Sequence, residues 1–232
     1  MIYFSYMNTN PIPIIAIDGT SSSGKGTIAY KIAQYFDFHY LNSGALYRLS
    51  AYTALTNNVN LSHKEALIQI ASQIQPHFKE KQVLVEGKDI WPIISTQEYG
   101  NHAAVISPIK ELREALFNVQ RNMIKSPGLV AEGRDMCTHV FTDAQVKLYL
   151  DADVTVRAER RFIDEQKKGS GKTLEKIVEE LEMRDHRDMT RDLGRLYPAD
   201  DACIVDTGNK TIEEVLDECI DWCEAQGIKK VG

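Results

Sequence analysis

The sequence predicts an α/β fold in which a parallel sheet is flanked by helices. A β-branched run at residues 12–17 ends at a glycine-rich turn, and an apolar pattern of helical spacing follows. Strand, turn and helix in this order begin a βαβ unit. Three later runs, at residues 129–131, 146–150 and 203–205, are short and apolar, as expected of parallel strands buried on both faces. With 232 residues, 43% of them hydrophobic, the chain can bury a large core without disulfides or metals.

The sequence clearly predicts two helices. The first follows the glycine-rich turn, and its apolar stripe is formed by Ile28, Ile32, Ala33 and Phe36. The last begins at a capping box made by Thr211 and Glu214. Its stripe is formed by Ile212, Val215, Leu216, Cys219, Ile220 and Cys223.

Residues 60–96 have a different pattern, which predicts a small insertion. Residues 82–86 alternate and residues 86–89 have the composition of a turn, so we expect an antiparallel hairpin. From pattern alone, the insertion is either a decorative edge hairpin or a subdomain that binds an acceptor substrate. The expected division is a core of residues 12–59 and 97–232, the insertion at 60–96, and an N-terminal extension at 1–11, in which Met7 is a second candidate start.

Charge and cysteine content argue against several classes of protein. The formal net charge is −6, which argues against general nucleic-acid binding, although it is compatible with a local basic pocket. The four cysteines lack zinc-type or disulfide-framework spacing, and Cys219 and Cys223 are expected to be buried thiols. No apolar run approaches the ~18 residues of a membrane span, and residues 1–10 lack the basic start of a secretory signal. We therefore expect a cytoplasmic protein without nucleic-acid or membrane partners.

The glycine-rich turn has the pattern of a P-loop, with Gly19, Gly24 and Lys25 at the spacing that cradles phosphates. Glycines let backbone N–H groups approach phosphate oxygens, the following helix adds its positive N-terminus, and Lys25 supplies a charge for the β- and γ-phosphates. Gly26 stands where a hydroxyl residue usually touches the metal, so Thr27 is expected to bind a phosphate while Mg²⁺ is held largely through water. The candidate ATP-binding residues are Gly19, Thr20, Ser21, Ser22, Ser23, Gly24, Lys25, Gly26 and Thr27.

Two further patterns distinguish between classes of P-loop protein. A GTP-dependent switch would need Asn-Lys-x-Asp, but Asn209 and Lys210 are followed by Thr and Ile, and no Asp has a Gly three positions later. The chain is also too short for a typical motor ATPase with its coupling modules. A small kinase is therefore favoured.

Arginines are concentrated late in the chain, where seven of the eleven lie between residues 157 and 195. Arg184, Arg187 and Arg191 would share one face of a helix. Such a helix could be a solvent-exposed one laced with Arg–Asp pairs, or it could bind phosphates. The basic, glycine-containing stretch at residues 167–172 suits a hinge or lid, and together with the P-loop it favours phosphate binding.

Charged residues also follow the predicted strand at 129–131. Ligands bind at the carboxyl ends of strands in open α/β sheets, so Glu132 is positioned to orient a hydrated Mg²⁺ and Arg134 to bind a phosphate. A structural Arg–Asp pair closing the turn is the alternative for Arg134 and Asp135. Arg48 is a weaker phosphate candidate, and Arg113 alone would pass for surface charge.

Together these motifs closely resemble the long type of bacterial cytidylate kinase. The resemblance covers the chain from about residue 14 to the last helix. It implies a P-loop NTPase-type parallel sheet flanked by helices, with a small inserted NMP-binding subdomain and a helical lid. The residues that carry it are Asp18-Gly19, Gly24-Lys25-Gly26-Thr27, Asn42-Ser43-Gly44-Ala45-Leu46-Tyr47-Arg48, Leu112-Arg113-Glu114-Ala115-Leu116, Glu132-Gly133-Arg134-Asp135 and Arg184-Asp185-x-Arg187-Asp188-x-x-Arg191.

The resemblance implies ATP- and Mg²⁺-dependent phosphorylation of CMP and dCMP, and we expect the protein to be a monomer. It implies that residues at about 163–173 form a lid that closes over ATP and excludes water. It also implies a role for each matching side chain. The catalytic residues would be Lys25, Arg134 and Arg191. The acceptor phosphate would be held by Arg48, Arg134 and Arg191, with Ser43 nearby. Cytosine would be bound by Arg113 and Asp135, and the pentose by Arg184 and Asp188.

Three positions depart from the family pattern. Asn42 replaces a frequent Asp, and Cys137 stands where the family has Gly or another small residue. Ala104 replaces a serine that helps to bind the base, so discrimination against UMP would rest more on Asp135 and Arg113, with Ser107 able to substitute only if the helix shifts. The rival hypotheses are a related kinase for UMP or shikimate and a regulatory module that binds ATP without transfer.

Overall fold

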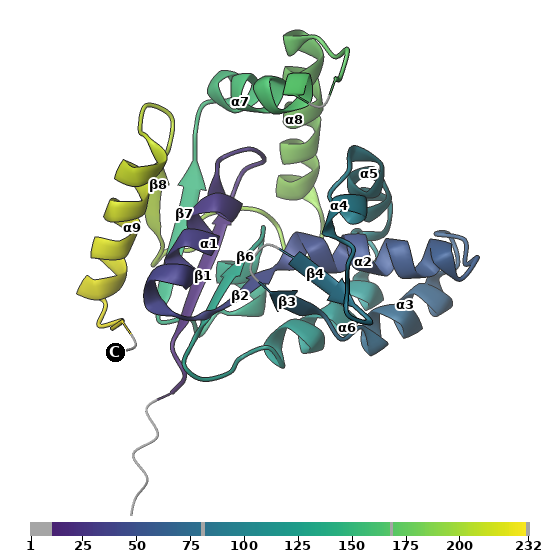
Figure 1. Cartoon of the computed structure of the whole chain (residues 1–232), viewed down its shortest axis with the longest axis horizontal. Helices are drawn as coiled ribbons and strands as arrows, with labels where there is room; N and C mark the ends of the chain where they lie inside the picture. Colours follow the sequence, from purple (N-terminus) through teal and green to yellow (C-terminus); the bar gives the residue numbers. More distant parts are fainter. Residues whose placement is uncertain (1–10, 80–81, 168, 231–232) are drawn as a thin grey trace, which may run out of the picture.

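The computed structural model describes residues 11–79, 82–167 and 169–230. Its centre is a five-stranded parallel sheet in the order β2-β6-β1-β7-β8 (Figure 1). The strands are β1 (Ile14–Gly19), β2 (His39–Asn42), β6 (Leu129–Glu132), β7 (Val146–Asp151) and β8 (Cys203–Asp206). The α/β class predicted from the sequence is confirmed.

The predicted strands are present, with small differences at their ends. β1 begins two residues later than expected, because Pro13 has no N–H to donate to a neighbouring strand. The Pro13 carbonyl instead accepts from the N–H of Leu129 at 3.0 Å. β6, β7 and β8 each run one residue further at the carboxyl end. Residues 1–10 of the expected N-terminal extension lie outside the described residues.

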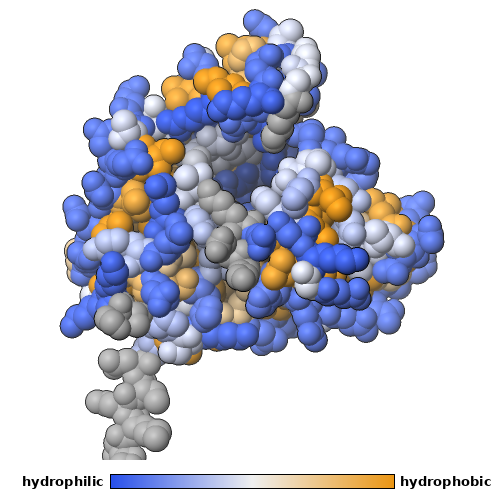
Figure 2. Space-filling view, viewed as in Figure 1, coloured by the Kyte–Doolittle hydropathy of each residue, from blue (hydrophilic) through white to orange (hydrophobic). Residues whose placement is uncertain are grey.

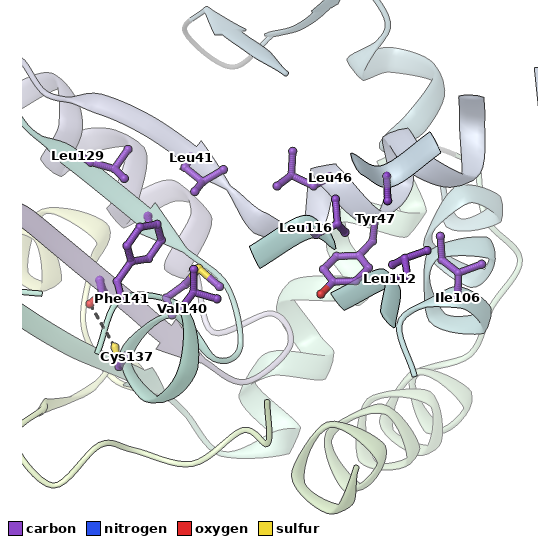
Figure 3. Close-up of a cluster of buried hydrophobic side chains, with 14 of the residues drawn as sticks. Leu41, Leu46, Tyr47, Ile106, Leu112, Leu116, Leu129, Cys137, Val140 and Phe141 are labelled. Atoms are coloured by element: carbon purple, nitrogen blue, oxygen red, sulfur yellow. Dashed lines mark hydrogen bonds between the residues drawn. The ribbon is translucent and has the colours of Figure 1, made fainter. Parts of the chain in front are cut away.

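Alternate residues of β1 face opposite layers of helix. Ile15 and Ile17 pack in a buried cluster with α1 (Lys25–Phe36) and α9 (Ile212–Ala225). Ile14 and Ala16 pack in a second cluster on the other face, part of which is shown in Figure 3. That face is covered by α2 (Ser43–Thr56), α3 (Lys64–Gln73), α6 (Lys110–Arg121) and the short π-helix η1 (Met136–Val140).

Both predicted helices are confirmed, although Ile212 of the second predicted stripe is 48% exposed. All four apolar residues predicted to line the first helix are buried in α1. In α9 the Thr211 hydroxyl accepts from the N–H of Glu214 at 3.2 Å, and the Glu214 carboxylate accepts from the N–H of Thr211 at 2.8 Å. Cys219 and Cys223 are buried free thiols, as predicted.

An antiparallel sheet lies where the alternating pattern predicts a hairpin. It is built from β3 (His77–Lys79), β4 (Gln82–Val85) and β5 (Lys88–Asp89), and positive φ at Glu86 and Gly87 forms the turn before β5. Two helices follow it, α4 (Trp91–Ile94) and α5 (Gln97–Ile106). A third apolar cluster joins this region to α2; its buried residues are Ala45, Leu49, Val83, Ile90 and Ile94.

The helices α7 (Val154–Lys167) and α8 (Leu174–Thr190) pack against each other at the top of Figure 1, where α7 runs across the view and α8 runs downward. They share a small core of Ala158, Ile177 and Leu181. Residues 163–167 of the expected lid are the last turn of α7, so the described non-helical part is confined to residues 169–173.

Within the described ranges, no helix combines the length and apolar composition that crossing a bilayer requires.

Candidate active site

The P-loop turn connects β1 to α1 in a conformation that depends on glycine. A Cβ atom at Gly19 would overlap the carbonyl oxygen of Leu150 on the neighbouring strand. Gly24 caps α1 with a φ of 85°, a region that disfavours other residues. The turn therefore presents the N-terminus of α1, with its partial positive charge, to a large cavity.

The predicted ATP-binding residues divide into two groups. Residues 22–27 line a cavity of about 740 Å³. Thr20 and Ser21 are buried and point elsewhere, since the Thr20 hydroxyl donates to Asp151 at 2.6 Å and the Ser21 hydroxyl accepts from Arg134 at 2.9 Å. Together with Gly19 they shape the turn and do not line its cavity.

Lys25 is buried at the floor of the cleft, where its Nζ donates to the carbonyl of Thr20 at 3.0 Å. Burial, followed by repulsion from the Arg134 guanidinium, lowers the pKa of Lys25 to about 7. Glu132 opposes this shift. The side chain is thus held where bound phosphate would restore its positive charge.

We expect ATP binding at about pH 8 to be accompanied by uptake of about one proton, because polyphosphate raises the depressed pKa of Lys25. Affinity for ATP should accordingly fall as the pH rises above about 7. Calorimetric titration in buffers of different ionisation enthalpy measures the uptake. Lys25→Met should abolish it, and equal enthalpies across buffers for the native chain would contradict the expectation.

Glu132 and Gly26 indicate where a cation would fit. A Cβ atom at Gly26 would lie 3.5 Å from the Glu132 Oε1 atom, so this carboxylate borders the place where other P-loops carry a metal-binding hydroxyl. Tyr40 donates to the same oxygen at 3.4 Å. Within the described ranges no group of three or more His, Cys, Asp or Glu could hold a metal. A single carboxylate beside the turn fits an ion that keeps most of its water and phosphate ligands, as Mg²⁺ does.

A second cavity, of about 220 Å³, lies beside the first and gathers the predicted acceptor residues. Figure 2 shows the hollow below α7 and α8, with hydrophilic residues inside it. The residues of the acceptor prediction that line this cavity are Ser43, Arg48, Arg113, Arg134, Asp135, Arg184, Asp188 and Arg191. Lys25 lines both cavities, so they meet at the P-loop lysine.

Arg134 connects the P-loop to α8. Its Nε donates to Asp188 at 2.9 Å, and its two terminal nitrogens donate to the Gly19 carbonyl and the Ser21 hydroxyl, each at 2.9 Å. The ion pair with Asp188 lowers the pKa of that carboxyl, although burial alone would raise it. The alternative pairing of Arg134 with Asp135 is not what the structure shows.

Arg113 and Asp135, which both line this cavity, form a buried ion pair. Arg113 is 4% exposed, so the surface charge suggested by its sequence context is wrong. Gly194, with a φ of 66°, packs against the pair so closely that a Cβ atom would overlap both partners. The sequence analysis missed Gly194, although its place three residues after Arg191 could have signalled a turn.

Arg191 lies one residue beyond α8 and has extended backbone, yet it lines the cavity with Arg184 and Arg187, as their spacing predicts. Its Nε donates to the Gly194 carbonyl at 2.5 Å. Among the described residues, one buried nitrogen of Arg191 and the Nε of Arg113 have no hydrogen-bond partner. Unsatisfied buried donors beside a cavity suit an anionic, hydrogen-bonding ligand.

Arg48 and Arg184 complete the basic wall. Arg48 donates to the carbonyls of Ile94 and Thr96, at 2.6 and 2.7 Å, and thereby anchors the segment between α4 and α5. Desolvation in the cleft and the Arg134 charge lower the pKa of Arg184 to about 10. Desolvation, followed by repulsion from Arg161, likewise lowers the pKa of Arg48 to about 10. Phosphate would stabilise the charged form of both side chains.

The departures from the family pattern have structural consequences. Asn42 caps α2 by accepting from the N–H of Ala45 at 3.0 Å. Cys137 is buried, and its Sγ donates to the carbonyl of Ala16 at 3.4 Å. Ala104 and Ser107 both line the acceptor cavity, where the Ser107 hydroxyl donates to the carbonyl of Ala104 at 3.4 Å.

The predicted insertion contributes little to the acceptor cavity. Of residues 60–96 in their described part, Trp91 lines it, while α2, α5, α8 and residues 132–135 supply most of the wall. Phe78 and Val83 line the larger cavity instead.

Buried groups outside the predicted set also surround the P-loop. Asp18 accepts from the N–H groups of Met136 and Cys137 at 2.8 and 2.7 Å, and its burial raises its pKa to about 6. Arg157 and Asp185 form a second buried ion pair. Arg157 and Asp185 were not assigned to the site from the sequence, because an Arg or Asp on an amphipathic helix carries no signal of its burial.

Comparisons with known proteins agree with this geometry. The cytidylate kinase family model matches residues 15–225. The cytidylate kinase of Ralstonia nicotianae is 41% identical over 218 residues, which cover 94% of this chain and 95% of the relative. That of Pseudomonas aeruginosa is 38% identical over 222 residues, with 93% and 97% covered.

A solved structure from Thermus thermophilus, TT1252, matches 95% of this chain and 100% of its own at a TM-score of 0.50 and 19% identity, which supports the fold alone. The chain therefore belongs to the cytidylate kinase family and is a nucleoside monophosphate kinase.

Proposed function

We propose that the protein transfers the γ-phosphoryl group of ATP to CMP and dCMP, giving CDP and dCDP. The observation that carries this proposal is the meeting of two cavities at Lys25, one bordered by the P-loop and the other by a buried Arg–Asp pair. Phosphoryl transfer needs donor and acceptor side by side among positive charges, and binding ATP alone would not require the second cavity. The names of the relatives support cytosine as the base.

In the donor cavity, Lys25 and residues 22–27 would hold the phosphates of ATP. Bound Mg²⁺ would supply further positive charge beside these phosphates. Glu132 would orient water molecules around the ion. Residues 163–173 would close over ATP as a lid and exclude water from the transfer.

In the acceptor cavity, Arg48, Arg134 and Arg191 would bind the phosphate of CMP, with Ser43 beside it. Arg184 and Asp188 would contact the pentose. Asp135 would accept from the exocyclic amine of cytosine, held in place by its ion pair with Arg113. UMP presents a carbonyl at that position, so it would face a carboxylate with no donor to offer.

The test is an ADP-release assay of the native chain with CMP, dCMP, UMP, AMP, GMP and shikimate. CMP and dCMP should give the highest kcat/KM. Equal or faster turnover of UMP or shikimate would replace the proposed acceptor. Tight ATP binding without turnover of any acceptor would instead favour a regulatory module.

Asp135→Ala should lower the preference for CMP over UMP by about tenfold or more, because it removes the acceptor for the cytosine amine. The measurement is the ratio of kcat/KM for the two nucleotides. Asp143→Asn, which alters an exposed ion pair away from both cavities, is the control and should leave the ratio unchanged. An unchanged ratio in Asp135→Ala would place recognition of the base elsewhere.

We further propose that the protein acts as a cytoplasmic monomer. Both proposed sites are formed within one chain, so no second copy is needed to complete them. Sedimentation at assay concentrations tests this proposal, and a dimer whose dissociation abolishes turnover would contradict it.

A further inference from the structure

Ser21 of the P-loop is held at three points by side chains from distant parts of the chain. Its N–H donates to Asp185 at 3.2 Å, its carbonyl accepts from Arg157 at 3.0 Å, and its hydroxyl accepts from Arg134 at 2.9 Å. Both peptide groups of Ser21 are thereby fixed, one by α8 and the other by α7.

Arg157 and Asp185 are closely paired and almost completely buried. They are joined at 2.5 Å, and each residue is 6% exposed. Arg157 is fixed further by donating from its Nε to the Ala152 carbonyl at 2.8 Å. Neither residue lines the donor or the acceptor cavity, so neither can touch a nucleotide directly there.

The residue after Ser21 shows why the backbone of the P-loop needs these contacts. Ser22 has a φ of 62°, in the left-handed region that non-glycine residues rarely adopt, and it lines the donor cavity. A strained residue persists only where its surroundings over-determine its conformation. The contacts to both sides of Ser21 supply that constraint at the start of the phosphate-binding turn.

The same helix also reaches the acceptor side. Asp188 lies one turn after Asp185 and pairs with Arg134, while Arg184 lines the acceptor cavity. This second attachment of α8, through Arg134, involves neither Arg157 nor Asp185, so the acceptor cavity should keep its shape when the buried pair is lost.

We propose that Arg157 and Asp185 are positioning residues that hold the P-loop, through the backbone of Ser21, in the conformation that binds ATP. The inference rests on the proposed function, since it assumes that ATP occupies the P-loop. It predicts that losing the pair weakens ATP binding more than CMP binding, because Ser21 belongs to the donor turn.

The decisive variant is the double substitution Arg157→Met and Asp185→Leu. Removing one partner leaves an unpaired buried charge and should lower Tm markedly, whereas removing both can leave stability nearly unchanged. We expect the double variant to regain Tm relative to Arg157→Met alone, while its Kd for ATP stays raised by about tenfold or more. Its Kd for CMP should change by less than about twofold. A merely structural role would not separate these readouts.

The measurements are calorimetric titrations with ATP and with CMP, and thermal unfolding of each variant. Asp185→Asn, which keeps the size of the side chain, is the second variant should the double variant not fold. The matched control is Arg121→Met with Asp143→Leu, an ion pair remote from both cavities. A folded double variant, or failing that a folded Asp185→Asn, with native affinity for ATP would overturn the proposal. Failure of the native chain itself to bind ATP would refute the proposed function and this inference with it.

Discussion

Replacing Lys25 with alanine is expected to lower kcat by on the order of 10³ or more without unfolding the protein. Lys25 lines both cavities and is buried at the floor of the cleft, so its ammonium group would lie beside the phosphoryl group in transit. Charge fixed at that point stabilises the transition state more than the ground state. Single-turnover measurements with saturating ATP and CMP would separate loss of transfer from loss of binding.

Lys147→Ala is a closely matched control. Lys147 is 9% exposed and Lys25 is 8% exposed, but Lys147 pairs with Asp201 at 2.8 Å and lines neither cavity. Its removal should affect Tm and leave kcat within about twofold. If Lys25→Ala retained native turnover, the meeting of the two cavities would not be the site of transfer.

Arg191→Ala should also lower kcat by on the order of 10³, while the Kd for ATP changes by less than about twofold. Arg191 lines only the acceptor cavity, and one of its buried nitrogens has no hydrogen-bond partner within the described residues. That donor would be satisfied by the transferring phosphoryl group. Parallel measurement of kcat, KM for CMP and Kd for ATP tests whether turnover falls while ATP binding is retained.

Arg121→Ala is the control for the loss of a guanidinium, because Arg121 pairs with Asp143 away from both cavities. Circular dichroism would establish that both variants are folded. Near-native kcat for Arg191→Ala would remove it from the transition state and leave it a role in binding alone. A raised Kd for ATP in Arg191→Ala would indicate that Arg191 lies nearer the donor nucleotide than its place in the acceptor cavity suggests.

Much of the fold could be predicted because the relevant signals are local. A β-branched run before glycines, a capping box and short apolar runs are each encoded by neighbouring residues, and all of them appear in β1, α9 and β6 to β8. β2 was not predicted, since His39 to Asn42 mixes polar and apolar residues and is set by its pairing with β6. The end of α7 was missed for a related reason: a basic, glycine-containing stretch resembles a hinge, yet its first residue, Lys167, is still helical.

The residues of the candidate site likewise divide into those that the local sequence predicts and those that it does not. The P-loop was evident because its glycines, lysine and helix are contiguous. The partners of Arg134 and Arg157 were not, since those pairs join residues 54 and 28 positions apart. Nothing in a linear pattern distinguishes a buried Arg–Asp pair from the exposed pairs that amphipathic helices commonly carry.

By itself, the sequence determined the α/β class, the P-loop and the residue types available to bind phosphate. Only the tertiary structure decided which of them meet: that Lys25 lies between two cavities, that Arg113 is buried against Asp135, and that Arg157 and Asp185 hold Ser21. The physical reason is that helix and strand signals depend on near neighbours, whereas burial and ion pairing depend on how distant elements pack.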